Sequence, residues 1–112
     1  FHCALMQPAA DAMAEALART AIAPPMLPVV ANVTAQAESD PDTIRSLLVK
    51  QVTGMVRWRE SVLWLKANGV DTLAELGSGK VLTGLVKRID GEMTGINAGT
   101  PAEIEALLKT LT

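Results

Sequence analysis

Short β-branched runs alternate with amphipathic helical stretches along this chain of 112 residues, and this alternation constrains the fold more than any other feature. The apolar spacing predicts five helices: 3–19, 41 to about 54, one through 58–65, 81–89, and one that follows Thr100 and includes Leu111. Three strands are expected: 29–33, 70–76 and 93–97. Strands separated by helices are typical of parallel crossovers, so the sequence predicts an α/β fold with a parallel sheet covered by helices on both faces.

Local signals support several of these boundaries. Asp40-Pro41 offers an N-cap followed by a proline at the first helical position, and Thr100 to Glu103 has the capping-box pattern. Asn68-Gly69 supplies a residue suited to the left-handed conformation that ends many helices. Gly77-Ser78-Gly79 predicts a tight turn that leads from a strand into the next helix.

The apolar pattern also predicts what is buried. The run from Val29 to Val33 does not alternate between apolar and polar residues, which indicates a strand buried on both faces. The last helix is expected to bury a stripe made of Ile104, Leu107, Leu108 and Leu111. Three strands make a thin sheet, so we expect further strands outside this chain. Residues 1–112 are therefore expected to be part of one domain.

Composition argues against several classes of function. Ten Lys and Arg stand against twelve Asp and Glu, a net charge of -2, so no basic face is expected that would bind nucleic acid. No apolar run approaches the roughly 20 residues of a membrane span. One cysteine and one histidine argue against a zinc site, and no metal is expected. The single cysteine fits a reducing compartment, so we expect a cytoplasmic protein.

The first residues of the chain are unusual. The chain begins with Phe1-His2-Cys3, without an initiator methionine or a basic leader, and we interpret it as a fragment. Hydrophobic residues make up 49% of the chain, so part of its apolar surface is expected to contact chain that is missing here.

Few residues carry obvious chemistry. His2 is the only histidine, so any imidazole base must be this residue, although a histidine near a chain end is more often incidental. Cys3 is expected to be a plain buried residue rather than a nucleophile. Gly77 to Lys80 looks like a phosphate loop, but Ala74 and Val81 occupy positions where that motif requires Gly and Ser or Thr. The nucleophile-elbow pattern also fails, because Leu76 stands where its first glycine belongs.

What remains of this motif is a turn at the carboxyl end of a strand, where α/β sheets bind ligands; a plain tight turn is an equally good interpretation. Lys80, Lys87 and Arg88 place three cations on one helix. Such a group is usually a solvated face, and the alternative is a surface that attracts an acidic partner.

Several segments together resemble one family. They are Phe1–Met6, Pro8–Ala10, Pro28–Val33, Leu48–Gly54, Val56–Trp58 and Glu75–Leu85. The F-H-x-x-x-M and G-x-G-K-V-L-x-G-L patterns are the more specific of these, and the chain closely resembles the C-terminal part of bacterial malonyl-CoA:acyl carrier protein transacylase. The resemblance implies the last third of a hydrolase-like α/β core, without the family's ferredoxin-like insert.

The resemblance also implies a reaction and its residues. In the family's ping-pong acyl transfer, a serine takes malonyl from CoA and passes it to the phosphopantetheine thiol of acyl carrier protein, for fatty acid biosynthesis, without a further cofactor. On this mapping His2 is the general base, and the main-chain carbonyl of Gln51 orients its ring. Because that contact is through the backbone, Gln51→Ala is expected to change little. Asn32 and Val81 map near the substrate, and Lys87 and Arg88 map to the docking side for the acidic carrier.

The serine segment, the oxyanion hole and the arginine for the malonyl carboxylate lie outside this chain. Residues 1–112 alone are therefore expected to be inactive, and to need the missing N-terminal part of the same enzyme as a partner. Two alternatives stay open: a non-catalytic proteolytic or expressed fragment that only folds or self-associates, and a piece of a polyketide synthase acyltransferase domain.

Overall fold

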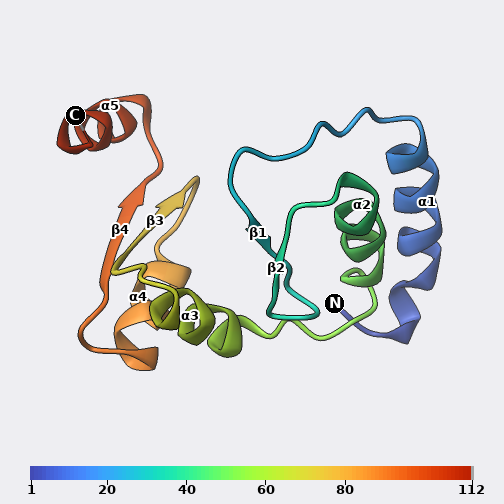
Figure 1. Ribbon diagram of the computed structural model, residues 1–112, viewed down its shortest axis with the longest axis horizontal. Helices are drawn as coiled ribbons and strands as arrows, with labels where there is room; N and C mark the ends of the chain where they lie inside the picture. Colours follow the sequence, from blue (N-terminus) through green and yellow to red (C-terminus); the bar gives the residue numbers. More distant parts are fainter. Residues whose placement is uncertain (112) are drawn as a thin grey trace. The chain divides into compact units, whose positions relative to one another are not determined.

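The computed structural model describes residues 1–111, and these form two compact units, Phe1–Ser61 and 62–111 (Figure 1). The first unit contains a 3-10 helix η1 (Ala4–Met6), the helices α1 (Gln7–Ala18) and α2 (Pro41–Lys50), and the strands β1 (Val29–Val30) and β2 (Ala37–Glu38). The second contains β3 (Thr72–Leu76), α4 (Val81–Ile89), β4 (Thr94–Ala98) and α5 (Pro101–Thr110). Helix α3 (Trp58–Ala67) contains the boundary between them.

Helices α1 and α2 pack against each other in the first unit. Ala10 of α1 and Leu47 of α2 are buried there. The guanidinium of Arg45 donates hydrogen bonds to the carbonyls of Leu17 and Thr20, the second over 2.7 Å. Carbonyls at the end of a helix lack partners within the helix, so this arginine on α2 satisfies the end of α1 and joins the two helices.

The expected buried strand over 29–33 is wrong. Only Val29 and Val30 are in a strand, and they pair antiparallel with β2, Val29 opposite Glu38 and Val30 opposite Ala37. Val29 is exposed. The chain turns back because Ala35 adopts a positive φ of 53° and its N–H donates to the carbonyl of Ala31 over 2.9 Å. A continuous β-branched run therefore belongs here to one arm of a tight reversal, and not to a parallel sheet.

Helix α2 begins where the sequence predicts. The side chain of Asp40 accepts hydrogen bonds from the Thr43 N–H and hydroxyl, at 2.9 and 2.8 Å, and these bonds lower the pKa of Asp40. The helix ends at Lys50, earlier than the expected 54, and the chain continues in turns to Gly54. A Cβ at Gly54 would lie 3.0 Å from both the Lys50 carbonyl and Val33, so this turn packs closely against the reversal after β1.

The second unit confirms the expected parallel crossover. Strands β3 and β4 are parallel, with Thr72 opposite Thr94 and Leu76 opposite Ala98, and α4 connects them and contacts both. Val86 on α4 is buried together with Met93 and Ala98. Gly69 ends α3 with a φ of 91°, as Asn68-Gly69 predicts. Residues 1–111 therefore contain one βαβ unit of the predicted α/β class and one antiparallel strand pair.

Helix α5 has the predicted start but not the predicted burial. The Thr100 hydroxyl accepts from the Glu103 N–H at 3.2 Å, and the Glu103 carboxylate accepts from the Thr100 N–H at 3.3 Å, which completes the capping box. The same carboxylate also accepts from the Gly99 N–H at 2.7 Å. However, Ile104, Leu108 and Leu111 are 40%, 56% and 72% exposed. The expected buried stripe is wrong for the described residues, because helix α5 packs mainly on β4 and those three side chains remain accessible.

No helix within residues 1–111 has both the length and the apolar character needed to cross a bilayer.

Candidate functional site

His2 is held by a contact across 49 positions of the chain. Its Nδ1 lies 2.7 Å from the main-chain carbonyl oxygen of Gln51. A carbonyl can only accept, so Nδ1 carries the hydrogen of this bond, and in the neutral ring the lone pair is then on Nε2. His2 also has a φ of 59°, which is uncommon for a residue other than glycine. The imidazole is exposed and oriented, with its basic nitrogen available.

The acceptor for His2 lies at the end of a helix. Gln51 is the C-cap of α2, and its N–H donates to the Leu47 carbonyl over 3.0 Å. Carbonyls in the last turn of a helix have no intrahelical donor. The Gln51 carbonyl is therefore available to His2 because the helix stops at this point.

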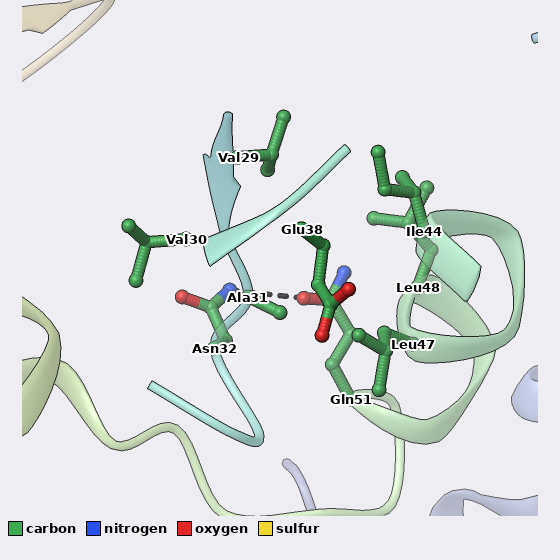
Figure 2. Close-up of a pocket in the computed structure, with 9 residues that line it drawn as sticks. All are labelled: Val29, Val30, Ala31, Asn32, Glu38, Ile44, Leu47, Leu48 and Gln51. Atoms are coloured by element: carbon green, nitrogen blue, oxygen red, sulfur yellow. Dashed lines mark hydrogen bonds between the residues drawn. The ribbon is translucent and has the colours of Figure 1, made fainter. Parts of the chain in front are cut away.

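Asn32 joins the same group through side chains. Its Nδ2 donates to Gln51 Oε1 over 2.9 Å, as Figure 2 shows. The Asn32 carbonyl in turn accepts from the Arg57 N–H at 2.8 Å. Three of the residues singled out in the sequence, His2, Asn32 and Gln51, are thus connected by two hydrogen bonds in the first unit.

A small apolar pocket lies beside this amide pair, between the β1–β2 pair and α2 (Figure 2). Its volume is about 100 Å³. It is lined by Val29, Val30, Ala31, Asn32, Glu38, Ile44, Leu47, Leu48 and Gln51. Pockets for drug-sized ligands have at least about 300 Å³, so this one is smaller than a typical ligand pocket.

Hydroxyl and thiol groups of the first unit do not complete a nucleophilic site with His2 in residues 1–61. The Ser61 hydroxyl is buried and donates to the Arg57 carbonyl over 2.8 Å, so it caps a helical turn. Cys3 is exposed, and the expectation that it is buried is wrong. The reason is that η1 and the start of α1 bury only Ala10. The unit offers an oriented base without a nucleophile bonded to it.

The turn from Gly77 to Gly79 lies at the carboxyl ends of the parallel strands, as predicted. Gly77 and Gly79 have φ values of 124° and 92°, which residues that carry a side chain rarely adopt. An open pocket of about 280 Å³ is lined here by Gly77, Ser78, Gly79, Lys80, Asn97, Gly99, Thr100 and Glu103. Val81, the first residue of α4, is 73% exposed.

Helix α4 carries the two cations that the sequence analysis assigns to docking. Lys87 and Arg88 are exposed and lie in its last turn. Its first turn is fixed by Glu75, whose Oε1 accepts from the Thr83 N–H at 2.9 Å and from the Thr83 hydroxyl at 2.7 Å. These bonds lower the pKa of Glu75. The helix is thereby attached to β3 while its cationic end faces solvent.

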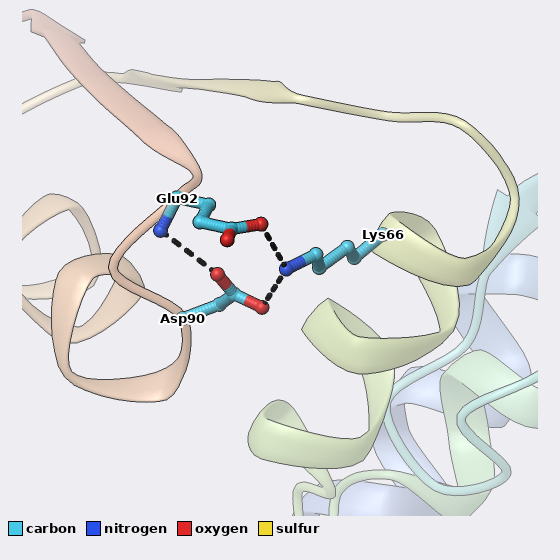
Figure 3. Close-up of polar contacts among 3 residues, drawn as sticks. All are labelled: Lys66, Asp90 and Glu92. Carbon is cyan, nitrogen blue, oxygen red and sulfur yellow. Dashed lines mark hydrogen bonds and ion pairs between the residues drawn. The ribbon is translucent and has the colours of Figure 1, made fainter.

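The second unit also contains an ion cluster that the sequence did not predict. Lys66 at the end of α3 bonds to Asp90 and, over 3.2 Å, to Glu92 (Figure 3). The bond from Lys66 lowers the pKa of Asp90, and the two carboxylates raise the pKa of Lys66. The only signal in the sequence was a lysine in a last helical turn and two acids around Gly91. This cluster joins α3 to the segment between α4 and β4.

No group of three or more His, Cys, Asp or Glu residues within the described part of the chain is arranged to hold a metal ion.

Comparison with known proteins gives consistent relatives. The chain is 47% identical over 107 residues to the malonyl CoA-acyl carrier protein transacylase of Salmonella typhimurium, which is 96% of this chain and 35% of that protein. The crystal structure of the acyl-carrier-protein-S-malonyltransferase from Bartonella henselae matches 99% of this chain and 35% of its own, with 57% identity and a TM-score of 0.90. No family model matches the chain.

A third similar structure contains a carrier protein. It is a malonyl-transacylase in complex with a type II polyketide synthase acyl-carrier protein, matched over 97% of this chain and 35% of that one, with 40% identity and a TM-score of 0.85. In all three comparisons this chain spans about a third of the relative's length.

Proposed function

This chain is a homologue of the malonyl-CoA:acyl carrier protein transacylases over a segment that spans 35% of their length, and we propose that it supplies the general base of their acyl transfer in fatty acid biosynthesis. The observation that carries this proposal is the 2.7 Å contact between His2 Nδ1 and the Gln51 carbonyl. It leaves Nε2 as the basic nitrogen on an exposed and oriented ring.

The reaction requires four proton transfers at Nε2, two in each half. In the first half, Nε2 takes the proton of a serine hydroxyl from the part of a transacylase that this chain does not contain. The serine oxygen bonds to the malonyl carbonyl carbon, the thioester C–S bond breaks, and the proton passes to the leaving CoA sulfur. In the second half, Nε2 takes the proton of the phosphopantetheine thiol, whose sulfur attacks the malonyl-serine ester. The serine oxygen leaves and receives that proton.

A neutral acceptor on Nδ1 suits this exchange. A carboxylate in that position would orient the ring and stabilise imidazolium, whereas a carbonyl orients the ring and stabilises the cation less. The overall reaction converts one thioester into another. Each half-reaction uses His2 first as the base and then, once it is protonated, as the acid. The Gln51 carbonyl therefore provides orientation without favouring the protonated ring strongly.

Other residues have proposed roles in binding. Asn32 and Val81 are substrate-side residues, and Lys87 and Arg88 form a docking surface for an acidic carrier protein. The exposure of both cations and the carrier complex of a similar transacylase support the second assignment. We place the chain in the C-terminal part of a larger parallel-sheet core in the cytoplasm. The exposed apolar side chains of α5 and Leu76 support contact with further parts of that core.

A chimera tests the proposed function. In it, residues 1–112 replace the corresponding third of the Bartonella henselae malonyltransferase, chosen because its structure matches with a TM-score of 0.90. We expect malonyl transfer from malonyl-CoA to carrier protein, and His2→Ala should lower kcat by about 10²- to 10⁴-fold, as expected for loss of a general base.

The matched control is Cys3→Ser, which changes the exposed neighbour of His2 and should leave the rate unchanged. Circular dichroism and thermal unfolding establish that each variant is folded. A folded chimera that transfers malonyl equally well with His2→Ala would contradict the proposed role of His2.

A further inference from the structure

The orientation of the His2 ring depends on a carbonyl at a helix end, and something must hold that end in place. The last residues of a helix fray easily, because their carbonyls have no intrahelical donors. Beyond Gln51 the chain continues in turns, with the Val52 N–H donating to Val49 and the Gly54 N–H to Lys50. The bonds between backbone groups therefore hold Gln51 only through short-range contacts within its own segment.

A second attachment comes from the side chain of the same residue. Gln51 Oε1 accepts from Asn32 Nδ2 at 2.9 Å (Figure 2), and the Gln51 main-chain oxygen lies 2.7 Å from His2 Nδ1. One residue thus takes part in two long-range hydrogen bonds, one through its amide and one through its backbone. A shift of Gln51 that broke the first bond would also move the acceptor of the second.

The segment that carries Asn32 is held independently of its side chain. The Asn32 carbonyl accepts from the Arg57 N–H at 2.8 Å, and Arg57 Nη1 donates to the Thr34 carbonyl at 3.1 Å. The Ala35 N–H donates to the Ala31 carbonyl within the reversal. Because all three bonds are accepted by backbone carbonyls of residues 31–34, the Asn32 amide has a fixed base from which to hold Gln51.

We propose that Asn32 is a positioning residue for the base, which acts through the Gln51 side chain by fixing the Gln51 carbonyl under the His2 imidazole. The proposal rests on the proposed function, since its kinetic consequence requires His2 to be the general base. It replaces the expectation that Gln51→Ala changes little, which considered only the backbone contact. It also replaces the substrate-side role given to Asn32 above, because Asn32 then affects the rate more than the binding of malonyl-CoA.

The kinetic test uses the chimera with Asn32→Leu. Leucine has a similar size, and the apolar lining of the adjacent pocket, including Val30 and Leu47, accommodates it without the hydrogen bond. We expect kcat to fall by about tenfold, the order of one lost hydrogen bond, with KM for malonyl-CoA changed by less than about twofold. An unchanged kcat, or an effect only on KM, would overturn the proposal.

Two further variants separate positioning from a structural role. Asn32→Asp should recover most of the rate, because the Gln51 amide can rotate and donate its N–H to the carboxylate. Gln51→Met should lower kcat as much as Asn32→Leu, and the double variant should be no slower than either single one, since both break the same bond. If Asn32→Leu fails to fold, Gln51→Met carries the test alone. Independent, multiplying effects would overturn the proposal.

Nitrogen-15 NMR of the imidazole provides a readout that does not depend on activity. The signals of His2 are identified by their absence from a His2→Gln variant. We expect Nδ1 to be protonated in the parent, and the two tautomers to become mixed in Asn32→Leu and Gln51→Met. If the tautomers become mixed in a chimera that is inactive, the positioning role of Asn32 is supported although the proposed function fails. If neither variant affects the tautomer, the positioning role is overturned.

Discussion

The unit that carries His2 and the unit that carries the parallel strands are stabilised by different kinds of contact. In residues 62–111, β3, α4 and β4 form a crossover whose strands pair over five positions each. In residues 1–61, the strands pair over two positions, and much of the arrangement comes from side chains that bond to distant backbone groups. Three side chains each form a hydrogen bond with a main-chain carbonyl more than 20 positions away, those of Arg45, Arg57 and His2.

The two kinds of contact respond differently to the loss of a single side chain. A βαβ crossover repeats the same backbone pairing, so the loss of one side chain leaves most of the ladder intact. The His2 region has one acceptor for one ring nitrogen, and its geometry depends on a few individual bonds. We therefore expect the second unit to be sensitive mainly to backbone changes, and the first to changes in single polar side chains.

The largest expected effect comes from a side chain added at Gly99, in the unit with the parallel strands. A Cβ at this position would lie 2.6 Å from the Gly77 carbonyl oxygen, so the two strand-to-helix turns would have to separate. We expect Gly99→Ala to destabilise the chimera by about 2 kcal/mol, in the range of overpacking a tight site. Urea unfolding measures this, and Gly91→Ala is the matched control because its Cβ meets nothing within 4 Å.

Native-state hydrogen exchange then locates the damage. For Gly99→Ala, amide protection should fall in β3 and β4 and stay unchanged in α2, because only the former adjoin the substituted turn. Equal losses in both units would show that they do not differ as argued above. A stability equal to that of Gly91→Ala would mean that the turns have room for a side chain.

A smaller effect is expected from the charges on α4. Replacing both Lys87 and Arg88 by Glu should raise KM for carrier protein by about tenfold at low salt, with kcat nearly unchanged, because opposite charges steer the encounter. Lys50→Glu is the control, since this exposed lysine lies in the last turn of α2 and in the other unit. An equal effect from Lys50→Glu would remove the assignment of docking to α4.

Sequence alone predicted the second unit well because its signals are local. A capping box, a glycine with positive φ and helical spacing each act within a few residues, and Thr100, Gly69 and α4 agree with them. The exposure of Leu108 was not predictable in the same way. Helical spacing identifies an apolar face, but it does not say whether the chain itself supplies the surface that covers that face.

The first unit was predicted less well because its structure depends on distant partners. Nothing near Val29 indicates that the chain will reverse at Ala35 and pair with Ala37. The contact between His2 and Gln51 was expected from family resemblance, and its geometry agrees with that expectation. The bond from Asn32 to the Gln51 side chain had no local signal, since 19 positions separate the two amides.

The smallest expected effect concerns the ion cluster of Lys66, Asp90 and Glu92 in the second unit (Figure 3). The bond from Lys66 places the folded-state pKa of Asp90 below its ordinary value of 3.8. The ionised carboxylate therefore stabilises the fold above about pH 4, and this contribution is lost as the pH falls through the lower, folded-state pKa. On the alkaline side, the raised pKa of Lys66 means that its contribution is lost only as the pH rises above 10.5.

Asp90→Asn removes the titrating group. The free energy of unfolding of the chimera should therefore depend less on pH below pH 4, and the variant should remain folded at neutral pH. Lys66→Met should flatten the same region, since it removes the partner that lowers the pKa of Asp90. Urea midpoints measured between pH 3 and pH 7 test this, and an acid dependence that survives both substitutions would assign the acid sensitivity to other carboxylates. The ion cluster would then contribute geometry without pH-dependent stability, and the parallel unit would depend on its backbone contacts even more than the comparison with the His2 unit implies.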